Sequence, residues 1–156
     1  MAVLKKLLYI AGRTFYIGTF VVTAIIILAW ISFYFVIPVV TDIYAANLAN
    51  DIKKLSLPEN TELIDSFSLA ANFAGTGNAT DIFGAIIIKS ELSLEQLQAH
   101  YAHYSVEPQT EDIINVIHGQ FKFNIKNETT PLINHYIVYA FANPPEFLRL
   151  FDYRGN

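Results

Sequence analysis

An uncharged run of 28 residues, Thr14 to Thr41, constrains this chain more than any other feature of its sequence. As a helix, the 26 residues 15–40 would extend about 39 Å, which exceeds the roughly 30 Å hydrocarbon core of a bilayer. Sixteen of the 26 are Phe, Ile, Leu or Val. Each of these favours membrane insertion by about 0.3–0.6 kcal/mol, and no charge opposes them. We therefore predict one transmembrane helix over residues 15–40, with the lipid bilayer as its partner.

Two other interpretations of the run fit less well. A cleaved signal peptide has an apolar core of about 7–15 residues followed by a small-residue cleavage site. This run is longer, and the stretch from Val39 to Ala45 contains no clean A-x-A pattern. A buried helix of a soluble domain is the second alternative, but 28 uncharged residues are too many for a domain of this size. The sequence thus predicts an uncleaved, single-pass signal anchor.

Charge predicts the orientation of the span. Residues 1–14 form a basic N-terminus with Lys5, Lys6 and Arg13 and no acidic residue, whereas the chain from Asp42 onward has seven Lys or Arg against fourteen Asp or Glu. These give +3 and −7, which sum to the formal net charge of −4. Cationic flanks stay in the cytoplasm. We predict a cell-membrane protein with a cytoplasmic N-terminus and an extracytoplasmic C-terminal domain, and no nucleic-acid partner, because that requires a basic face.

Residues 41–57 are predicted to form a juxtamembrane helix or stalk. Ile43, Leu48, Ile52 and Leu55 recur at roughly helical spacing and would share one face, and Pro58 should end the helix. A rigid stalk is preferred over a partner-binding helix. The 99 residues 58–156 suffice for one small domain, and the chain has no cysteine, so that domain must be stabilised by its hydrophobic core.

Hydrophobic periodicity predicts an α+β fold for this domain, of ββαββ type, with an antiparallel sheet and one main packing helix. The helix should start at Ser93, which forms a capping box with Gln96. The segment 106–110 is interpreted as a turn, and Glu146 to Leu150 as one helical turn. The predicted strands are 62–69, 82–89, 112–118, 120–126 and 135–141, and the predicted apolar stripe of the helix is Leu94, Leu97, Tyr101 and Tyr104.

One glycine-rich segment is a candidate binding loop. Gly75, Thr76, Gly77 and Asn78 have amides that could cradle an anion. A dinucleotide fingerprint requires a third glycine at position 80, where the chain has Thr, and the Gly-Lys-Ser/Thr of a Walker loop is absent. We therefore favour an ordinary strand-connecting loop, predict no cofactor, and retain these four residues as a binding hypothesis only.

The histidines do not form a recognisable catalytic or metal-binding pattern. His100 and His103 lie three apart on the predicted helix, a spacing that can bind one metal ion, but no third ligand accompanies them. We interpret both as exposed polar residues and predict no metal site. An exported hydrolase would need Asn78, His118 and His135 to converge in one pocket. The sequence has no assembled catalytic motif, so we do not expect an enzyme.

Two segments resemble a known group of proteins. Residues 57–64 read LPENTELI, Gly75-Thr76-Gly77-Asn78 follows, and residues 86–97 read IIIKSELSLEQL. This arrangement is similar to small, uncharacterised, membrane-anchored proteins of Firmicutes, which carry an LPxxT…GNG…SxLSxExLxxYY pattern after one N-terminal span. The likeness covers residues 57–104, and the closing FDYRGN is loosely similar. It implies a bacterial source and a single-pass topology, and it implies no activity.

The leading hypothesis is a bitopic membrane protein whose exported domain binds an envelope or surface partner, either another protein or a second copy of itself. The alternative is an accessory subunit of a larger membrane complex that acts through its span. The span has small or hydroxylated residues that could support helix contacts, Thr19, Thr23, Ala24, Ala29 and Ser32, but it has no G-x-x-x-G motif.

Overall fold

The structure, a computed structural model, describes residues 1–73, 79–111, 113–116, 121–125 and 132–155. Its first element is the helix α1 (Ala2–Lys53), which contains the whole uncharged run. The chain divides into two compact units, Met1–Val36 and Ile37–Asn156, and α1 belongs partly to each. The two units are described separately below.

The first unit is the N-terminal part of α1. Its large apolar side chains are mostly half exposed or more, as at Phe20 and Trp30. The hydroxyls of Thr14, Thr19 and Ser32 each donate to the carbonyl four residues earlier, so the helix satisfies them internally. Within the described part of the chain, α1 is the one helix long and apolar enough to cross a membrane.

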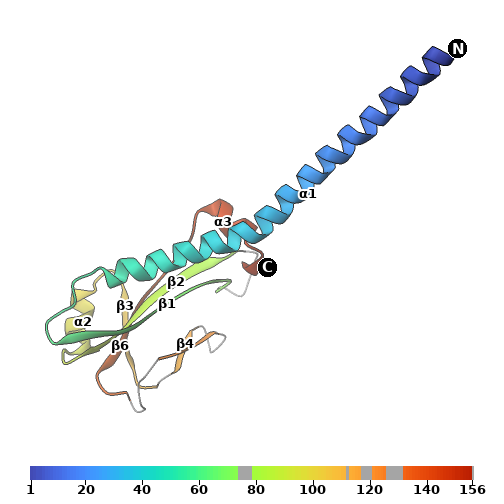
Figure 1. The fold of residues 1–156 in the computed structure, drawn as a ribbon. Coiled ribbons are helices and arrows are strands. Elements are labelled where there is room, and N and C mark those ends of the chain that lie inside the picture. The colour runs from blue at the N-terminus through green and yellow to red at the C-terminus, as the bar shows by residue number, and fades with distance from the viewer. Residues whose placement is uncertain (74–78, 112, 117–120, 126–131, 156) are drawn as a thin grey trace. The chain divides into compact units, whose positions relative to one another are not determined.

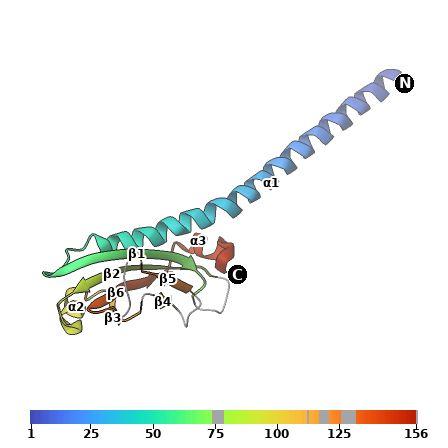
Figure 2. The ribbon, with the colours of Figure 1, turned by 60° about the horizontal axis from the view of Figure 1, so that its bottom comes forward.

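The second unit contains a four-stranded antiparallel sheet in the order β1-β2-β6-β3 (Figure 1). A separate antiparallel hairpin of β4 and β5 lies on the opposite side of this sheet from α1 (Figure 2). The α+β class with an antiparallel sheet is therefore confirmed. The strands are β1 (Thr61–Ala71), β2 (Asp81–Ser90), β3 (Ser105–Gln109), β4 (Ile113–Val116), β5 (Phe121–Asn124) and β6 (His135–Ala142).

Strand β2 is the centre of the core because both of its faces are covered. Its apolar residues alternate between two sides, as the period of two requires. Ile86 and Ile88 pack with Ile52 of α1 and Leu97 of the next helix. Phe83 and Ile87 pack on the other face with Ile125 and Leu132, the residues that follow β5 and precede β6. This explains the continuous apolar sequence of the strand.

The C-terminal part of α1 packs on the sheet. Its buried residues recur every three or four positions, and they are Ile37, Thr41, Ala45, Ala49 and Ile52. Four residues of this segment were predicted to share one packed face of the helix. The prediction was wrong for Ile43 and Leu55, because their side chains are 52% and 38% exposed. Residues 37–40, predicted as the end of the span, and residues 41–53, predicted as a juxtamembrane helix or stalk, are thus part of the compact unit, and α1 ends at Lys53.

Small residues allow α1 to approach the sheet closely. A Cβ built on Gly84 of β2 would lie 2.6 Å from the backbone nitrogen of Ala49 and 2.9 Å from the carbonyl carbon of Leu48. Real Cβ atoms do not approach so closely, so the strand and the helix meet backbone to backbone. Alanine at positions 45 and 49 keeps the helix side of this contact equally thin.

Helix α2 (Leu94–His100) begins where the sequence predicts but ends at His100, before His103 and Tyr104, which were predicted to lie on it. Ser93 accepts a hydrogen bond from the Gln96 amide, and the Gln96 side chain accepts one from the Ser93 amide at 2.9 Å. Leu97 and Tyr101 are fully buried against the sheet, which confirms the predicted apolar stripe. The predicted capping box is therefore present.

One strand was missed by the sequence analysis. Residues 105–109 are not a turn but the edge strand β3, which pairs with β6 from Ser105↔Tyr139 to Gln109↔His135. Its sequence, SVEPQ, contains Pro108, and proline is tolerated on an edge because one side of an edge strand needs no donor. Within the predicted strands 112–118 and 120–126, the described residues form β4 and β5, which pair as the separate hairpin and not with the main sheet.

The chain closes with the helix α3 (Glu146–Phe151) and the short 3-10 helix η1 (Tyr153–Gly155). The predicted helical turn from Glu146 to Leu150 is confirmed by α3. These elements lie near the start of β2, since the Thr80 amide donates to the Arg149 carbonyl at 3.0 Å.

Candidate functional site

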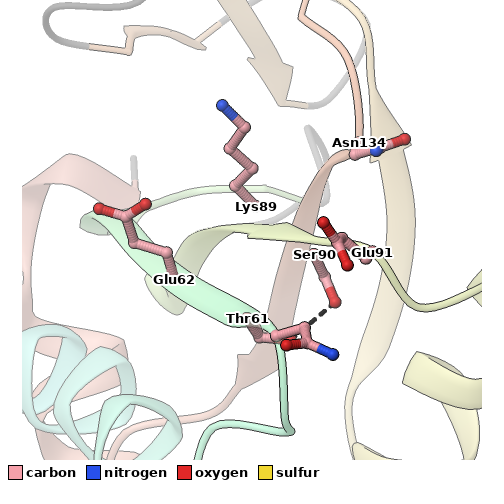
Figure 3. A pocket seen from close by; sticks show the side chains of 7 residues that line it. Thr61, Glu62, Lys89, Ser90, Glu91 and Asn134 are labelled. Carbon is pink, nitrogen blue, oxygen red and sulfur yellow. Dashed lines mark hydrogen bonds between the residues drawn. The ribbon is translucent and has the colours of Figure 1, made fainter.

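Two polar clusters lie at opposite ends of β2, and we call them the distal pocket and the C-terminal clamp. The distal pocket has a volume of about 410 Å³ (Figure 3). Its seven lining residues come from the start of β1, the end of β2 and the segment before β6, and they are Asn60, Thr61, Glu62, Lys89, Ser90, Glu91 and Asn134.

Two asparagines shape the backbone of the distal pocket. Asn60 and Asn134 have φ angles of 55° and 59°, which are the left-handed conformations that asparagine tolerates better than most residues. The Asn134 carbonyl accepts the Ser90 amide at 2.9 Å, and the Asn60 carbonyl accepts the Glu91 amide at 3.3 Å. Both asparagines therefore connect their segments to the last residues of β2, and strained positions of this kind concentrate at functional sites.

The two hydroxyls of the distal pocket bond to each other. Thr61 Oγ1 and Ser90 Oγ lie 2.7 Å apart (Figure 3), and Ser90 Oγ also accepts the Leu92 amide at 3.2 Å. Ser90 is only 2% exposed. Its hydroxyl therefore holds the pocket together and is poorly placed to attack a substrate.

Three charged side chains give the distal pocket its chemical character. Glu62 and Lys89 are direct cross-strand partners of β1 and β2. Figure 3 shows both extending from the sheet away from the Thr61–Ser90 bond. With Glu91, the pocket offers two carboxylates, one ammonium group and two asparagine amides. Such a set forms hydrogen bonds and ion pairs with a polar partner.

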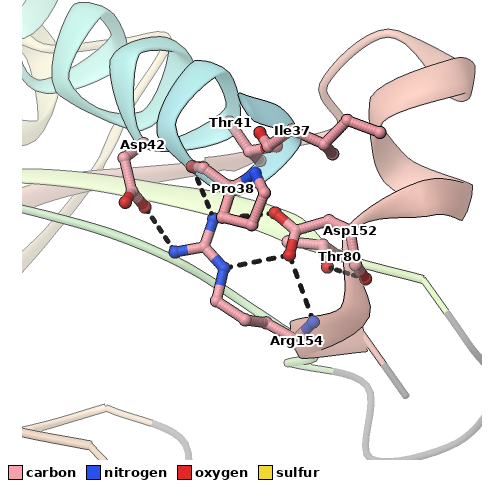
Figure 4. A network of polar contacts seen from close by, with 7 residues as sticks. All are labelled: Ile37, Pro38, Thr41, Asp42, Thr80, Asp152 and Arg154. Carbon is pink, nitrogen blue, oxygen red and sulfur yellow. Dashed lines mark hydrogen bonds and ion pairs between the residues drawn. The ribbon is translucent and has the colours of Figure 1, made fainter. Parts of the chain in front are cut away.

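The second cluster, which we call the C-terminal clamp, consists of Pro38, Asp42, Asp152 and Arg154 (Figure 4). Arg154 binds Asp152 through two nitrogens, with Nε–Oδ1 at 3.0 Å and Nη2–Oδ2 at 2.7 Å. It also donates to Asp42 Oδ1 at 2.6 Å and to the Pro38 carbonyl at 2.9 Å. One guanidinium group thus joins the end of the chain to α1.

The contacts within the clamp shift the pKa values of Asp152 and Arg154. Asp152 is fully buried, which by itself would raise its pKa, but hydrogen bonds from the side chain and backbone of Arg154 outweigh burial and lower the pKa. The hydrogen bond to Asp152 raises the pKa of Arg154 further above its already high value. Both groups are therefore charged at neutral pH, and the clamp is a bidentate ion pair with a buried acid.

The binding-loop residues and histidines that the sequence analysis singled out are not among the residues of these two clusters. Gly75, Thr76, Gly77 and Asn78 lie outside the described residues, as does His118. His100 Nε2 lies 2.7 Å from the Ser56 carbonyl, and His135 is buried with Nδ1 2.8 Å from the Ile133 carbonyl. These contacts give both histidines structural roles. Among the residues that the structure describes, no three His, Cys, Asp or Glu gather where they could hold a metal ion.

Sequence analysis did not identify the distal pocket or the C-terminal clamp. The pocket is built from strand ends that pair only in the fold, and its one local signal is an asparagine at each positive-φ position. The clamp joins residues 112 or more positions apart, such as Asp42 and Arg154. Its one local signal is a charged pair, Asp152 and Arg154, in the closing segment FDYRGN.

Comparison with known proteins identifies no relative: no family model, curated protein or solved structure matches this chain.

Proposed function

We propose that this protein is a single-pass membrane-anchored binding protein whose folded domain presents the distal pocket to an envelope or surface partner. The observation that carries the proposal is the continuity of α1. One helix holds both the exposed apolar run and the buried residues from Ile37 to Ile52 that complete the domain core. The domain is therefore joined to its anchor by a continuous helix, and the distal pocket lies at the other end of β2 from the contacts of Arg154 with Pro38 and Asp42.

The position of the pocket supports a role in recognition. Strand β2 begins at Asp81, which bonds to α3, and ends at Ser90 in the distal pocket. Nine intervals of about 3.3 Å place the two ends roughly 30 Å apart. The end of the apolar run lies at the Asp81 end, because Arg154 of the clamp contacts Pro38 and Asp42. The distal pocket therefore lies at the opposite end of β2 from the end of the apolar run.

The charge distribution supports an extracytoplasmic domain. Three basic residues precede the span, and the chain after it carries seven more acidic than basic residues. Basic flanks are retained in the cytoplasm during insertion. The chain has no cysteine, so the domain does not depend on disulfide formation after export.

Binding fits the pocket better than catalysis does. The Ser90 hydroxyl is buried and engaged by Thr61 and the Leu92 amide, and the seven lining residues include no histidine to act as its base. A nucleophile needs both access and a base within hydrogen-bond reach. Exposed carboxylate, ammonium and amide groups on a rigid sheet need neither, and they suit recognition of a polar surface.

A site-specific cross-link tests this proposal. A photoreactive benzoyl-phenylalanine at position 89 of the full chain should give one adduct of discrete mass in intact cells. The adduct should disappear when the Glu62→Gln and Glu91→Gln changes are added, since they remove both carboxylates of the pocket. The exposed pair of Lys54 and Asp51 provides the control, and Lys54→Ala should leave the adduct unchanged. An adduct that survives the loss of both carboxylates contradicts recognition at this pocket.

A shallow groove on the span favours the second candidate function, an accessory subunit that acts through its transmembrane helix. Its lining residues are Phe15, Gly18, Thr19, Val22 and Thr23. A Cβ at Gly18 would meet nothing within 4 Å, so this glycine leaves room for another helix.

Replacing the span discriminates the two functions. The replacement must stop at Val36, because Ile37 and Thr41 are buried in the domain. A neutral apolar sequence at 15–36 that keeps the cross-link from position 89 supports recognition by the domain. Loss of the cross-link, with the protein still folded and inserted, supports action through the span.

A further inference from the structure

Helix α3 exposes an apolar face. Phe147, Leu150 and Phe151 are 50%, 54% and 57% exposed, although all three side chains are large and apolar. Their spacing of i, i+3 and i+4 places them on the same side of the helix. The rings of Phe147 and Phe151 are in contact, with centroids 5.2 Å apart. The three side chains therefore form one continuous surface, which we call the α3 face.

The other side of α3 is fixed to the domain. Leu148 is buried, and Arg149 Nε donates to Asp81 Oδ1 at 3.0 Å. The Arg149 carbonyl accepts the Thr80 amide, also at 3.0 Å. Because the neighbouring residues are held in this way, the α3 face cannot turn inward to join the core.

The segment that follows α3 contacts the end of the apolar run. Three residues after α3 ends, Arg154 contacts the Pro38 carbonyl and the Asp42 carboxylate (Figure 4). Asp42 is the first charged residue after the run. A charge does not enter the hydrocarbon core without a large cost, so the surface of any bilayer that the run spans lies on the N-terminal side of Asp42, near the end of the run that the domain buries. This holds at whatever angle the span crosses.

We infer that the α3 face is a second membrane contact, inserted into the interfacial layer of the bilayer that α1 spans. This inference rests on the membrane anchoring proposed above. The interfacial layer is about 5–8 Å thick on each side, and amphipathic helices bury their apolar faces to a similar depth. Two phenylalanines and a leucine at that depth hold the α3 end of the domain at the membrane surface.

A lipid surface fits the α3 face better than a protein partner does. Three half-exposed side chains supply roughly 300 Å² of apolar surface. A stable protein interface buries at least about 1,200 Å² in total, so the α3 face is too small to hold a second copy by itself. Insertion into a bilayer that already holds the chain costs no further loss of translational freedom, so even a small apolar area contributes.

A fluorescent label tests the inference on the full chain. Because the chain has no cysteine, Leu150→Cys provides a single attachment point for an environment-sensitive nitrobenzoxadiazole label. The matched control is Ile133→Cys, an exposed apolar residue beside the distal pocket that is 69% exposed. Each protein is reconstituted into phosphatidylcholine vesicles with and without a headgroup-attached spin-label quencher. The single tryptophan, Trp30, reports on the anchor through quenching by brominated acyl chains in unlabelled protein.

The expected result is a blue-shifted, lipid-quenched label at position 150, an unquenched label at 133 and a quenched Trp30. If Trp30 is quenched but the label at 150 is not, the anchor stands and the inference about α3 is overturned. Equal quenching at 150 and 133 also overturns it, because the contact would not be specific to α3. A shift at 150 that depends on protein concentration, not on lipid quencher, assigns the face to a second copy. If Trp30 is not quenched, the anchoring proposal fails, and the inference that rests on it fails too.

Discussion

Gly84 of β2 and Ala49 of α1 meet backbone to backbone, so closely that a Cβ on the glycine would lie 2.6 Å from the alanine nitrogen. This contact determines where the helix crosses the sheet. It also makes the segment after the apolar run part of the domain core, because the buried residues Ala45 and Ile52 flank the crossing. The helical segment from Ile37 to Lys53 is therefore part of the compact second unit.

Substitution at Gly84 should separate the helix from the sheet. Gly84→Val forces the backbones apart, and we expect the free energy of unfolding of the domain to fall by at least about 2 kcal/mol. The measurement is urea unfolding of the detergent-solubilised full chain, followed by near-ultraviolet circular dichroism. Gly12→Ala is the control, since its Cβ meets nothing within 4 Å, and it should leave stability unchanged or slightly raised. An unchanged urea midpoint for Gly84→Val would show that the crossing is not close-packed.

Loss of the guanidinium at position 154 should release the C-terminal segment from α1. Arg154→Ala leaves the buried Asp152 carboxylate without its cation, which costs up to about 3 kcal/mol for a pair that is partly exposed on the arginine side. Arg154→Lys should recover only part of this, because an ammonium group cannot bind both carboxylate oxygens in parallel. The same urea experiment measures both. Lys54→Ala, at an exposed pair, should cost under about 0.5 kcal/mol, and an equal loss at position 54 would contradict the special role of the clamp.

Because the pKa of Asp152 is lowered in the folded protein, we expect the free energy of unfolding to fall as the solution becomes acidic. In the unfolded chain an aspartate titrates near pH 4, so between that value and its lower folded pKa the unfolded state binds more protons. The contribution of Asp152 is therefore fully present above about pH 4 and is lost as pH falls through the folded pKa. We expect Asp152→Asn to be less stable at pH 7 and to show a shallower decline below pH 4. Parallel stability curves for the two proteins in acid would exclude this role.

Much of the fold could be predicted because its signals are local. The capping box of Ser93 and Gln96, the two-sided apolar strand β2 and the terminal helical turn at Glu146 all follow from neighbouring residues. The packed face of α1 was mispredicted because contact with the sheet is made by small residues, Thr41, Ala45 and Ala49, which a search for bulky apolar side chains overlooks.

The remaining features depend on pairing between distant segments. Strand β3 has few strand-forming residues and contains Pro108, so only its pairing with β6 reveals it. The distal pocket needs Thr61 to meet Ser90, and the C-terminal clamp needs Asp42 to meet Arg154. No spacing in the sequence encodes such contacts, because they arise from the register of the sheet and from the path of α1 across it.

The most direct test of the account is the side of the membrane on which the domain lies. The chain has no native cysteine, so His103→Cys, at an exposed position after α2, can be labelled alone with a membrane-impermeant maleimide in intact cells that express the full chain. A cysteine added before Met1 reports on the other side. We predict labelling at position 103 in intact cells and labelling of the N-terminal cysteine only after lysis. Labelling at 103 only after lysis would place the domain in the cytoplasm and contradict presentation of the distal pocket to a surface partner.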